Sequence, residues 1–441
     1  MVARRNLVVG LGKTGLSAAR WLHARGEAVA VTDSRPTPPG LEALAKLGGD
    51  FPLHLGGFNI GLLDSTDRIV LSPGVSRAEP LVRAAEARGI AILGDIELFA
   101  GAKEAPAVAI TGTNGKSTAT TLVAEMARAA GRRVLAGGNL GEPVLELLAQ
   151  PVPEFYVLEL SSFQLESTDS LELIAAAVLN VTPDHMDRYS TLADYAAAKA
   201  RIFDHAATAI INLDDPRVTS MPRAGQRQVG FSLTRTGVDW GLATRSGDVY
   251  LARAGEPVLP LGELKLPGRH NAANALAALA VGAAAGLPLE PMLETLRRFA
   301  GLPHRSQWIA ERRGVRFIDD SKGTNVGATL ASVEGLGGPI VMIAGGDGKG
   351  QDFTPLAAAF RGKVRHAVLI GRDREILARA LTGACSTEFA TDMDAAVAAA
   401  ARAARPGDLV LLSPACASLD MFRDYGQRGD AFAAAARRLE P

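Results

Sequence analysis

Short apolar runs alternate with longer amphipathic stretches along most of the chain. Runs of four to six apolar residues predict buried strands, and the stretches between them have the length and period of helices. A first series ends before residue 96. Its predicted helix is 14–25, and its predicted strands are 6–11, 28–32, 68–71 and 90–93.

The same alternation begins again near residue 106 and once more near residue 301. The second series has predicted strands at 107–110, 156–160 and 176–180, and predicted helices at 116–130, 192–205 and 271–300. Between the last two helices, 228–265 has short segments and glycine turns that predict added β-hairpins. The third series has predicted strands at 316–318, 340–344, 366–370 and 409–412. We therefore predict an α/β fold of three domains in series, at 1–95, 96–300 and 301–441.

Composition excludes several classes of protein. Lys+Arg and Asp+Glu are equal at 47 each, so the chain lacks the basic excess of a protein that binds nucleic acid or an anionic membrane. Two cysteines, Cys385 and Cys416, cannot form a disulfide framework and indicate a reducing compartment. The longest uncharged stretch, 271–289, contains Asn, Gly and Pro and predicts a helix and a turn, not a membrane span. We expect a cytoplasmic monomer without nucleic-acid or membrane partners.

A glycine-rich turn follows the first predicted strand. Gly10, Gly12 and Gly15 would let the backbone approach a phosphate at a helix N-terminus, and Asp33 ends the next strand, where an acid can bind ribose. This pattern predicts a nucleotide or diphosphate site. It also leaves an NAD-dependent dehydrogenase open, and any tight turn between strand and helix favours glycine.

A second turn, Thr-Gly-Thr-Asn-Gly-Lys-Ser-Thr at 111–118, is more specific. Its backbone N–H groups would hold phosphates, Lys116 would reach the β- and γ-phosphate oxygens, and Ser117 would hold Mg²⁺. The spacing differs from the usual P-loop, because Ile110 stands where glycine is usual. Glu159 ends a nearby apolar run and could hold Mg²⁺ as well, although a surface or capping acid fits the same pattern. ATP or GTP binding is the prediction.

Two further residues of the middle segment have a chemical and a structural interpretation. His185 lies between Asp184 and Asp187 after a predicted strand, and could be a metal ligand, an acid/base or a structural histidine. Lys199 lies in an Ala-rich helix, where the pattern alone indicates an exposed cation. An amine held at low polarity could instead react with CO₂ and become a metal-binding carbamate.

Charged residues also follow the strands of the third segment. They are His304-Arg305, the sequence Asp-Asp-Ser-Lys-Gly-Thr-Asn at 319–325, and Asp347-Gly-Lys349. Each group could form a structural salt bridge. Since each follows an apolar strand, we expect several to converge on one cleft at the strand ends.

With the motifs at 111–118 and 319–325, the chain resembles the Mur ligases, ATP-dependent amide-forming enzymes of peptidoglycan precursor synthesis. The resemblance covers nearly all of the chain and implies a Rossmann-like domain, a central P-loop-type ATPase domain with added β-hairpins and a second Rossmann-like domain. The first glycine turn and the sequence Ser-Pro-Ala-Cys-Ala-Ser-Leu-Asp-Met-Phe at 413–422 are most similar to the members that add D-glutamate.

The resemblance implies a set of ligands and of residues that bind them. The substrates would be ATP, UDP-N-acetylmuramoyl-L-alanine and D-glutamate, with two Mg²⁺ ions and a carbamylated Lys199. Residues implied for the UDP substrate are Gly12, Thr14, Gly15, Asp33, Ser34, Arg35, Ser72, Gly74, Asn139, Gln164 and His185. Those implied for ATP are Gly112, Thr113, Asn114, Gly115, Lys116, Ser117, Thr118, Asn271, Asn274, Arg305 and Asp320. Those implied for D-glutamate are Lys322, Thr324, Lys349, Ser418, Phe422 and Tyr425.

The implied metal ligands are Ser117, Glu159, His185 and the Lys199 carbamate, and the implied catalytic residues are Lys116, His185 and Lys199. In the implied reaction, a substrate carboxylate attacks the γ-phosphate, and the amine of D-glutamate displaces phosphate from the resulting acyl phosphate. Three alternatives stay open: a sibling ligase with another Mur or folylpolyglutamate-type substrate, the NAD-dependent dehydrogenase, and a non-catalytic nucleotide-gated binding protein.

Overall fold

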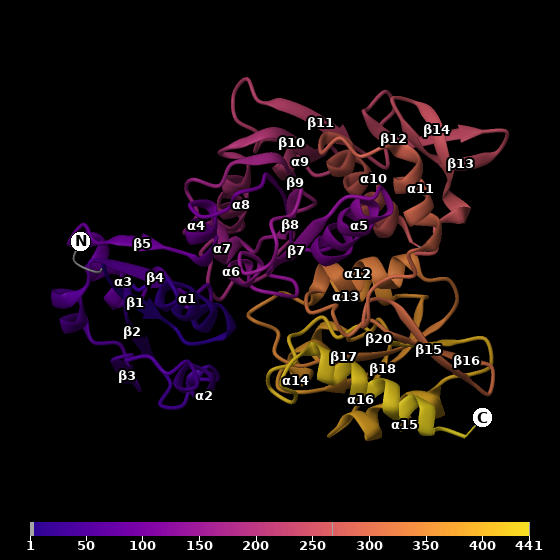
Figure 1. Ribbon diagram of the computed structural model, residues 1–441. Coiled ribbons are helices and arrows are strands. Elements are labelled where there is room, and N and C mark those ends of the chain that lie inside the picture. Colours follow the sequence, from indigo (N-terminus) through magenta and orange to yellow (C-terminus); the bar gives the residue numbers. More distant parts are fainter. Residues whose placement is uncertain (1–3, 267, 441) are drawn as a thin grey trace. The chain divides into compact units, whose positions relative to one another are not determined.

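Three β-sheets follow one another along the chain in the computed structural model, which describes residues 4–266 and 268–440 (Figure 1). Their strand orders are β3-β2-β1-β4-β5, β14-β13-β12-β11-β10-β9-β6-β8-β7 and β15-β16-β20-β17-β18-β19. The predicted α/β fold with three domains in series is confirmed, and its boundaries at 95 and 300 stay a prediction. By packing, the first two sheets belong to one compact unit. The third belongs to another, together with Val181–Leu192 and Leu261–Ala273.

The first sheet is parallel throughout and has β1 at its centre. Its elements are β1 (Arg5–Val9), α1 (Lys13–His23), β2 (Ala28–Asp33), α2 (Leu41–Ala45), β3 (Leu53–Leu55), the 3-10 helix η1 (Ile60–Ser65), β4 (Arg68–Leu71), α3 (Pro80–Ala87), β5 (Ala91–Leu93) and α4 (Asp95–Ala100). Leu7 and Val9 of β1 are fully buried with Ile69 and Leu71 of β4. The sequence pattern missed β3, because three residues centred on a histidine form no apolar run.

The second sheet is parallel from β7 to β11, with β6 between β8 and β9. Its strands are β6 (Ala107–Thr111), β7 (Val134–Gly138), β8 (Phe155–Glu159), β9 (Leu173–Val178), β10 (Ala206–Asn212), β11 (Arg227–Phe231), β12 (Trp240–Arg245), β13 (Asp248–Arg253) and β14 (Glu256–Pro260). The helices of this segment are α5 (Lys116–Ala129), α6 (Val144–Leu147), α7 (Ser162–Leu165), α8 (Leu192–Ala200), η2 (Arg201–Phe203), α9 (Pro216–Thr219), η3 (Leu261–Glu263), α10 (Arg269–Ala284) and α11 (Leu289–Arg298).

The predicted hairpins at 228–265 are only partly confirmed. Strands β12, β13 and β14 form an antiparallel meander, as predicted. Strand β11 pairs in parallel with β10 instead, after the crossover through α9. Phe231 at its end is buried, so β11 extends the parallel core and the added strands begin only at β12.

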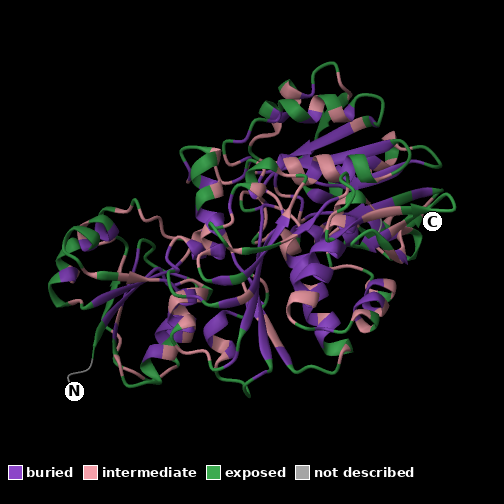
Figure 2. Ribbon diagram, turned by 90° about the horizontal axis from the view of Figure 1, so that it is seen from above, coloured by how far each residue is buried: buried purple, intermediate pink, exposed green. Residues whose placement is uncertain are grey.

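The third sheet is parallel except for its edge strand β15, which is antiparallel to β16. Its elements are β15 (Gln307–Arg312), β16 (Val315–Asp319), α12 (Val326–Gly335), β17 (Ile340–Gly345), α13 (Thr354–Phe360), β18 (Val364–Ile370), α14 (Arg374–Ala380), β19 (Ser386–Phe389), α15 (Met393–Ala403), β20 (Leu409–Leu412) and α16 (Tyr425–Arg438). Alternate residues of β17 face opposite cores. Val341 and Ile343 pack with α15 and α16, and Ile340 and Met342 with α12 and α13. The central strands are accordingly buried on both faces (Figure 2).

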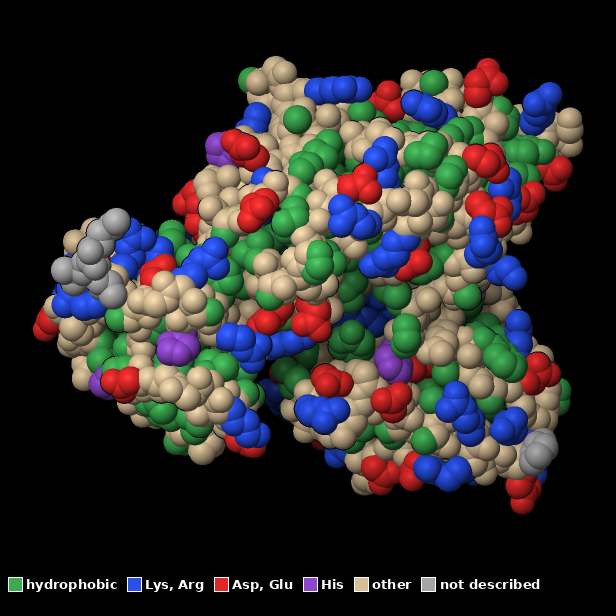
Figure 3. Space-filling view, in the orientation of Figure 1, with side chains coloured by type: hydrophobic (Ala, Val, Ile, Leu, Met, Phe, Trp, Pro, Cys, Tyr) green, Lys and Arg blue, Asp and Glu red, His purple; other side chains and the backbone are tan. Residues whose placement is uncertain are grey.

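The surface agrees with the balanced charge of the sequence. On the face drawn in Figure 3, acidic and basic side chains lie interspersed. In residues 4–266 and 268–440, no helix is long and apolar enough to span a membrane.

Candidate active site

The P-loop connects the central strand β6 to helix α5. Gly115 precedes the helix with a φ of +83°, a conformation that glycine adopts without strain. A Cβ atom at this position would lie 2.2 Å from Oδ1 of Asn274 on α10, so the close approach of α10 also requires glycine. The structure therefore places Asn274, one of the residues implied for ATP, against the loop.

Asn180, just after β9, fixes the shape of this loop from the neighbouring strand. Its Oδ1 accepts a hydrogen bond from the Asn114 amide at 2.9 Å, and its Nδ2 donates to the Asn114 carbonyl at 3.1 Å. Its own carbonyl accepts the Thr113 amide at 2.9 Å. The sequence analysis gave Asn180 no such role. Its one signal was position, since polar residues at the carboxyl end of a buried parallel strand commonly serve the site there.

Two lysines donate to one carbonyl of the loop. Lys116 Nζ lies 2.9 Å from the Gly112 oxygen and 2.9 Å from the Thr113 oxygen, and Lys199 Nζ lies 2.9 Å from the same Gly112 oxygen. Lys199 is 1% exposed and also packs 4.4 Å from the ring centre of Tyr195. The exposed-cation interpretation of Lys199 is therefore wrong. The Ala-rich helix gave no sign of burial because the packing partners lie elsewhere in the sequence.

Glu159, the last residue of β8, is buried, and one of its two carboxylate oxygens accepts a hydrogen bond. Oε1 accepts a hydrogen bond from Nδ2 of Asn139 at 2.6 Å, while Oε2 has no hydrogen-bond partner among the described residues. An unpartnered buried carboxylate oxygen is unfavourable unless a cation or donor completes it. Ser117, in the first turn of α5, is also buried. Hydroxyl and carboxylate oxygens suit Mg²⁺, which usually takes one or two protein carboxylates together with waters and phosphates.

No group of three or more His, Cys, Asp or Glu side chains is placed to hold a metal ion in residues 4–266 and 268–440. The predicted ligand set draws on other donors too, namely the Ser117 hydroxyl and a Lys199 carbamate. The oxygens that suit Mg²⁺ at this place are therefore those of the Glu159 carboxylate and the Ser117 hydroxyl.

The first glycine turn is as tight as the sequence predicts. A Cβ atom on Gly15 would lie 1.9 Å from the Gly10 carbonyl oxygen, which also accepts a hydrogen bond from Ser72 Oγ at 2.6 Å. Helix α1 begins directly after Gly12. This geometry brings a helix N-terminus and glycine backbone together, as a diphosphate site requires.

The Asp33 carboxylate accepts hydrogen bonds from the protein itself, whereas the dinucleotide pattern suggests that it binds ribose. Its carboxylate accepts the Leu11 amide at 2.7 Å and three N–H groups of Arg35 at 2.7 to 2.9 Å. Burial would raise the pKa of Asp33, but these hydrogen bonds and the guanidinium lower it to about 2. Four donors occupy the four acceptor positions of the carboxylate in this structure, so Asp33 supports the glycine turn. Its predicted contact with the UDP substrate stays a prediction.

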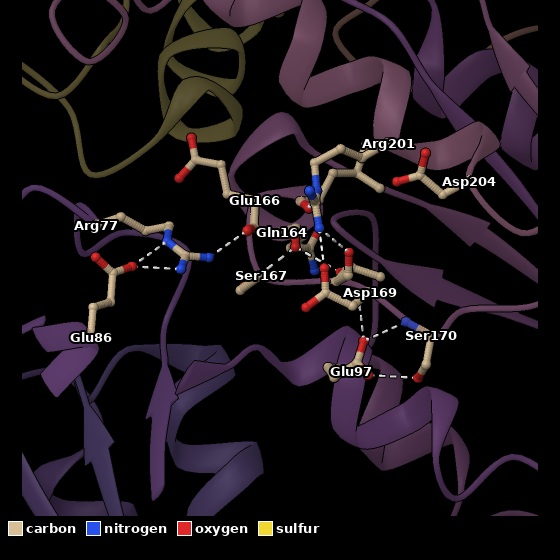
Figure 4. A network of polar contacts seen from close by, with 12 residues as sticks. Arg77, Glu86, Glu97, Gln164, Glu166, Ser167, Asp169, Ser170, Arg201 and Asp204 are labelled. Atoms are coloured by element: carbon tan, nitrogen blue, oxygen red, sulfur yellow. Dashed lines mark hydrogen bonds and ion pairs between the residues drawn. The ribbon is translucent and has the colours of Figure 1, made fainter. Parts of the chain in front are cut away.

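The segment after Glu159 is held by Arg77 and by Glu97 of α4 (Figure 4). Arg77 donates to the Glu166 carbonyl at 2.7 Å, and Glu97 accepts the backbone amides of Asp169 and Ser170 at 2.6 and 3.0 Å. Arg201, from the middle domain, contacts Asp169 from the other side. The segment that follows β8 is thus fixed by hydrogen bonds from Arg77 and Glu97 and by the ion pair with Arg201.

Gln164 on α7 belongs to the same segment and uses both ends of its amide within the protein. Nε2 donates to Asp95 Oδ2 at 3.0 Å, and Oε1 accepts the Ser161 amide and hydroxyl at 3.1 Å each. Gln164 is 3% exposed. Its predicted contact with the UDP substrate stays a prediction.

Asp95 gives the protein a pH-dependent stability. It is 2% exposed, its Oδ1 has no hydrogen-bond partner among the described residues, and burial raises its pKa to about 6 although Gln164 opposes the shift. Between about pH 4 and pH 6 the Asp95 carboxyl is therefore protonated in the folded chain, whereas in the unfolded chain it has lost its proton. The contribution of Asp95 to the free energy of unfolding falls over this range and is lost as the pH rises through about 6. We expect the Asp95 contribution to fall by about 2 kcal/mol from pH 4 to pH 8.

Urea unfolding of the wild type and of Asp95→Asn at several pH values measures this contribution. Asparagine keeps an acceptor for Gln164 but does not titrate, so the stability of the variant relative to the wild type should rise with pH. Parallel pH profiles for the two proteins would contradict the assignment.

The charged groups at 319–325 and 347–349 follow β16 and β17, as predicted. His304-Arg305 does not follow a strand, because it lies between α11 and β15. Asp320 is buried and accepts hydrogen bonds from Ser332 Oγ at 2.6 Å and Ser413 Oγ at 2.8 Å. Burial raises the pKa of Asp320 to about 6, against the effect of these hydroxyls and of the Arg305 charge. Asp347 and Ala417 exchange backbone hydrogen bonds of 3.0 and 2.8 Å, which joins the loops after β17 and β20.

Lys349 pairs with an acid that sequence reasoning did not assign to it. Asp184, 5% exposed, accepts Lys349 Nζ at 2.5 Å and Asn325 Nδ2 at 3.0 Å. Burial would raise the pKa of Asp184, but the charges of Lys349 and His185 and these hydrogen bonds hold it below the ordinary value. His185 follows with a φ of +58° and donates its amide to Asp184. Residues 165 positions apart carry no sequence signal of such a pair.

Lys322 Nζ lies 3.9 Å from the ring centre of Tyr425, at the start of α16. Beside them Arg428, 1% exposed, donates to Ser321 Oγ and O at 3.0 and 2.8 Å and to the Cys416 carbonyl at 3.0 Å. Burial lowers the pKa of Arg428 to about 10. The sequence analysis assigned no role to Arg428, because one of 38 arginines cannot be recognised as buried without the fold.

The remaining predicted residues are placed as follows. Ser72, Thr118, Asn271 and Ser418 are buried, Thr14, Thr324 and Phe422 are half-buried, and Ser34 and Gly74 are exposed. All predicted binding roles of these residues stay predictions.

The fold and the site together define a three-domain α/β protein with a P-loop and a neighbouring buried acid, Glu159. Three family descriptions match successive parts of the chain: Mur ligase MurD-like N-terminal domain at 4–94, Mur ligase middle domain at 110–282 and Mur ligase glutamate ligase domain at 304–416. The chain therefore belongs to the Mur ligase family.

Curated relatives extend this match over nearly the whole sequence. The UDP-N-acetylmuramoylalanine–D-glutamate ligase of Nitrosococcus oceani is 52% identical over 441 residues, with 99% of this chain and 97% of the relative covered. The ligase of the same name from Pseudomonas putida is 51% identical over 438 residues, with 98% and 97% covered.

Solved structures share the fold at low identity. The UDP-N-acetylmuramate-alanine ligase MurC of Thermotoga maritima has a TM-score of 0.63 at 18% identity, with 98% of this chain and 99% of that chain covered. The MurF ligase of Thermotoga maritima in complex with ADP has a TM-score of 0.62 at 17% identity, with 99% and 95% covered.

Proposed function

We propose that this protein is an ATP-dependent ligase that joins D-glutamate to UDP-N-acetylmuramoyl-L-alanine, with release of ADP and phosphate, in peptidoglycan precursor synthesis. The observation that carries the proposal is the identity of about half of all residues, over nearly the full length, with ligases named for that reaction. A P-loop beside a buried acid supplies the chemistry that such a reaction needs.

In this proposal the P-loop holds the triphosphate of ATP. Its backbone N–H groups bind phosphate oxygens, and the Lys116 ammonium leaves the loop carbonyls for the β- and γ-phosphates. Ser117 and Glu159 would hold Mg²⁺, which offsets the negative charge of the phosphates when it is bound. Asn139 keeps the Glu159 carboxylate in place through its 2.6 Å hydrogen bond.

The reaction proceeds through an acyl phosphate. The carboxylate of the UDP substrate attacks the γ-phosphorus and ADP leaves. The amine of D-glutamate then attacks the acyl carbon, phosphate leaves and one proton is released. No enzyme nucleophile is needed, and burial raises the pKa of the two cysteine thiols, to about 12 for Cys416 and about 11 for Cys385, so neither thiol is an activated nucleophile.

Lys199 is proposed to act as a carbamate. Its amine is buried and shares the Gly112 carbonyl as an acceptor with the Lys116 ammonium, so a carbamate formed on it would lie beside the P-loop. The neutral amine adds to the carbon of CO₂ and loses a proton, which turns a cation into an anion that can bind a metal. A second Mg²⁺, which the resemblance assigns to His185 and carbamylated Lys199, stays a prediction.

D-glutamate brings two carboxylates, which require cations in the third domain. Lys322 and Lys349 are proposed to bind them, together with Thr324, Ser418, Phe422 and Tyr425. Because Asp184 neutralises Lys349 in this structure, a carboxylate of the amino acid would compete with Asp184 for the ammonium. The cytoplasmic location and the monomeric state expected from the sequence stay predictions.

Phosphate release from ATP and Mg²⁺ in the presence of UDP-N-acetylmuramoyl-L-alanine tests the function. We expect release that depends on D-glutamate and not on L-glutamate, L-alanine or L-lysine. Release with another amino acid would indicate a sibling ligase. No release with any amino acid would contradict the ligase and favour a non-catalytic nucleotide-binding protein.

A further inference from the structure

Lys13 is an exposed lysine inside the first glycine turn. It is the first residue of α1, between Gly12 and Thr14, and its ammonium donates to the Gly141 carbonyl of the middle domain at 2.6 Å. No carboxylate forms an ion pair with Lys13 in the described part of the chain. A full positive charge therefore lies at the glycine turn with a neutral oxygen as its acceptor.

Two other cations of this domain, Arg35 and Arg20, each pair with a carboxylate. Arg35 gives three hydrogen bonds to Asp33 and forms an ion pair of 2.7 Å with it. Arg20, two turns further along α1, also reaches the middle domain, but it pairs with the Glu146 carboxylate at 2.8 Å. Lys13 and Arg20 thus make similar bridges from one helix, and only Lys13 combines an unneutralised charge with a place in the turn.

We propose that Lys13 is a binding residue for the diphosphate of the UDP substrate, with its ammonium moving from the Gly141 carbonyl to a phosphate oxygen. A diphosphate at a glycine turn and helix N-terminus lies within reach of the residue that begins the helix. A charged phosphate oxygen is a stronger acceptor for an ammonium than a neutral carbonyl. The identity of the substrate in this inference rests on the proposed function. The position of the Lys13 charge rests on the geometry of the glycine turn.

Titration calorimetry with UDP, which carries the diphosphate without the sugar acid, tests the inference directly. Lys13→Met keeps the length of the side chain and removes its charge, and we expect the Kd for UDP to rise about tenfold. Lys13→Arg keeps the charge and should restore most of the affinity. Arg20→Met, the matched control, removes the other bridge of α1 and should leave the UDP Kd unchanged.

Two further measurements separate substrate binding from a purely structural bridge. In the phosphate-release assay, Lys13→Met should raise the KM for the UDP substrate and leave kcat and the KM values for ATP and D-glutamate unchanged. The UDP Kd of the variant should also depend less on NaCl than that of the wild type. An unchanged UDP Kd in a folded Lys13→Met protein would overturn the inference, as would equal losses in Lys13→Met and Arg20→Met.

The UDP titration needs no turnover, so the two proposals can fail separately. A UDP Kd that depends on Lys13, without D-glutamate-dependent phosphate release, would overturn the proposed reaction and support the diphosphate site. If phosphate release depends on D-glutamate but the UDP Kd is the same in the wild type and in Lys13→Met, the proposed reaction would be supported and the role of Lys13 overturned.

Discussion

Replacement of Lys116 by alanine is expected to abolish phosphate release from ATP, with kcat lower by about a thousandfold or more. The ammonium lies over the P-loop, where it hydrogen-bonds the Gly112 and Thr113 carbonyls, and its loss removes a cation from the proposed triphosphate site. The UDP Kd should stay within twofold of the wild-type value, because the glycine turn proposed to bind UDP belongs to another domain. Phosphate release under saturating substrates and UDP calorimetry measure the two quantities.

Lys46→Ala is a suitable control for the loss of a lysine, since Lys46 is an exposed residue of the first domain paired only with Glu42 on the same helix. We expect it to behave as the wild type in both assays. Normal turnover of Lys116→Ala would contradict the assignment of 111–118 as the loop that binds the phosphates of ATP. A large loss of UDP affinity in that variant would show that the two sites are not independent.

Replacement of Lys199 by alanine is expected to lower kcat at least a hundredfold, and millimolar acetate or propionate should restore part of the activity. The variant loses the proposed carbamate, and the space left by the side chain can admit a small carboxylate with the same anionic group. The buried position of Lys199 and its 2.9 Å hydrogen bond to Gly112 make this space part of the P-loop surroundings. Phosphate release as a function of carboxylate concentration gives the measurement.

Lys116→Ala is the matched control for this rescue. Both lysines donate to the Gly112 carbonyl, so both substitutions disturb the same loop, but a carboxylate can replace only a carbamate. Rescue of both variants would indicate a general effect of the anion. Full activity of Lys199→Ala without any additive would exclude a catalytic Lys199, and thermal unfolding of the variant would separate inactivity from loss of the fold.

Much of the nucleotide site could be predicted from local sequence. A buried strand, a glycine turn and a helix follow one another within about twenty residues at 107–129, so short-range pattern determines where Lys116 and Ser117 lie. Glu159 was predictable for the same reason, because it ends an apolar run and parallel strands end at one edge of a sheet. Most central strands were found from their apolar runs, whereas the short, exposed strands β3 and β19 were missed. The largely buried strand β10 was missed as well.

The contacts that shape the site could not be predicted, because they join residues that are far apart in the chain. The hydrogen bonds between Asn180 and Asn114 join residues 66 positions apart, and the Asp184–Lys349 ion pair joins residues 165 positions apart. The hydrogen bonds of the Arg35 side chain to Asp33, beside the first glycine turn, were likewise not predicted from the sequence.

The sequence by itself determined the α/β class, the three-domain series, the P-loop and the acid beside it, since periodicity and turn chemistry act over a few residues. The tertiary structure alone decided that Lys199 is buried against the P-loop. It also decided that, among the residues it describes, one Glu159 oxygen has no hydrogen-bond partner and Lys13 has no carboxylate partner. Burial and pairing depend on which distant segments pack together. Identical local patterns can therefore lead to an exposed cation or to a buried one.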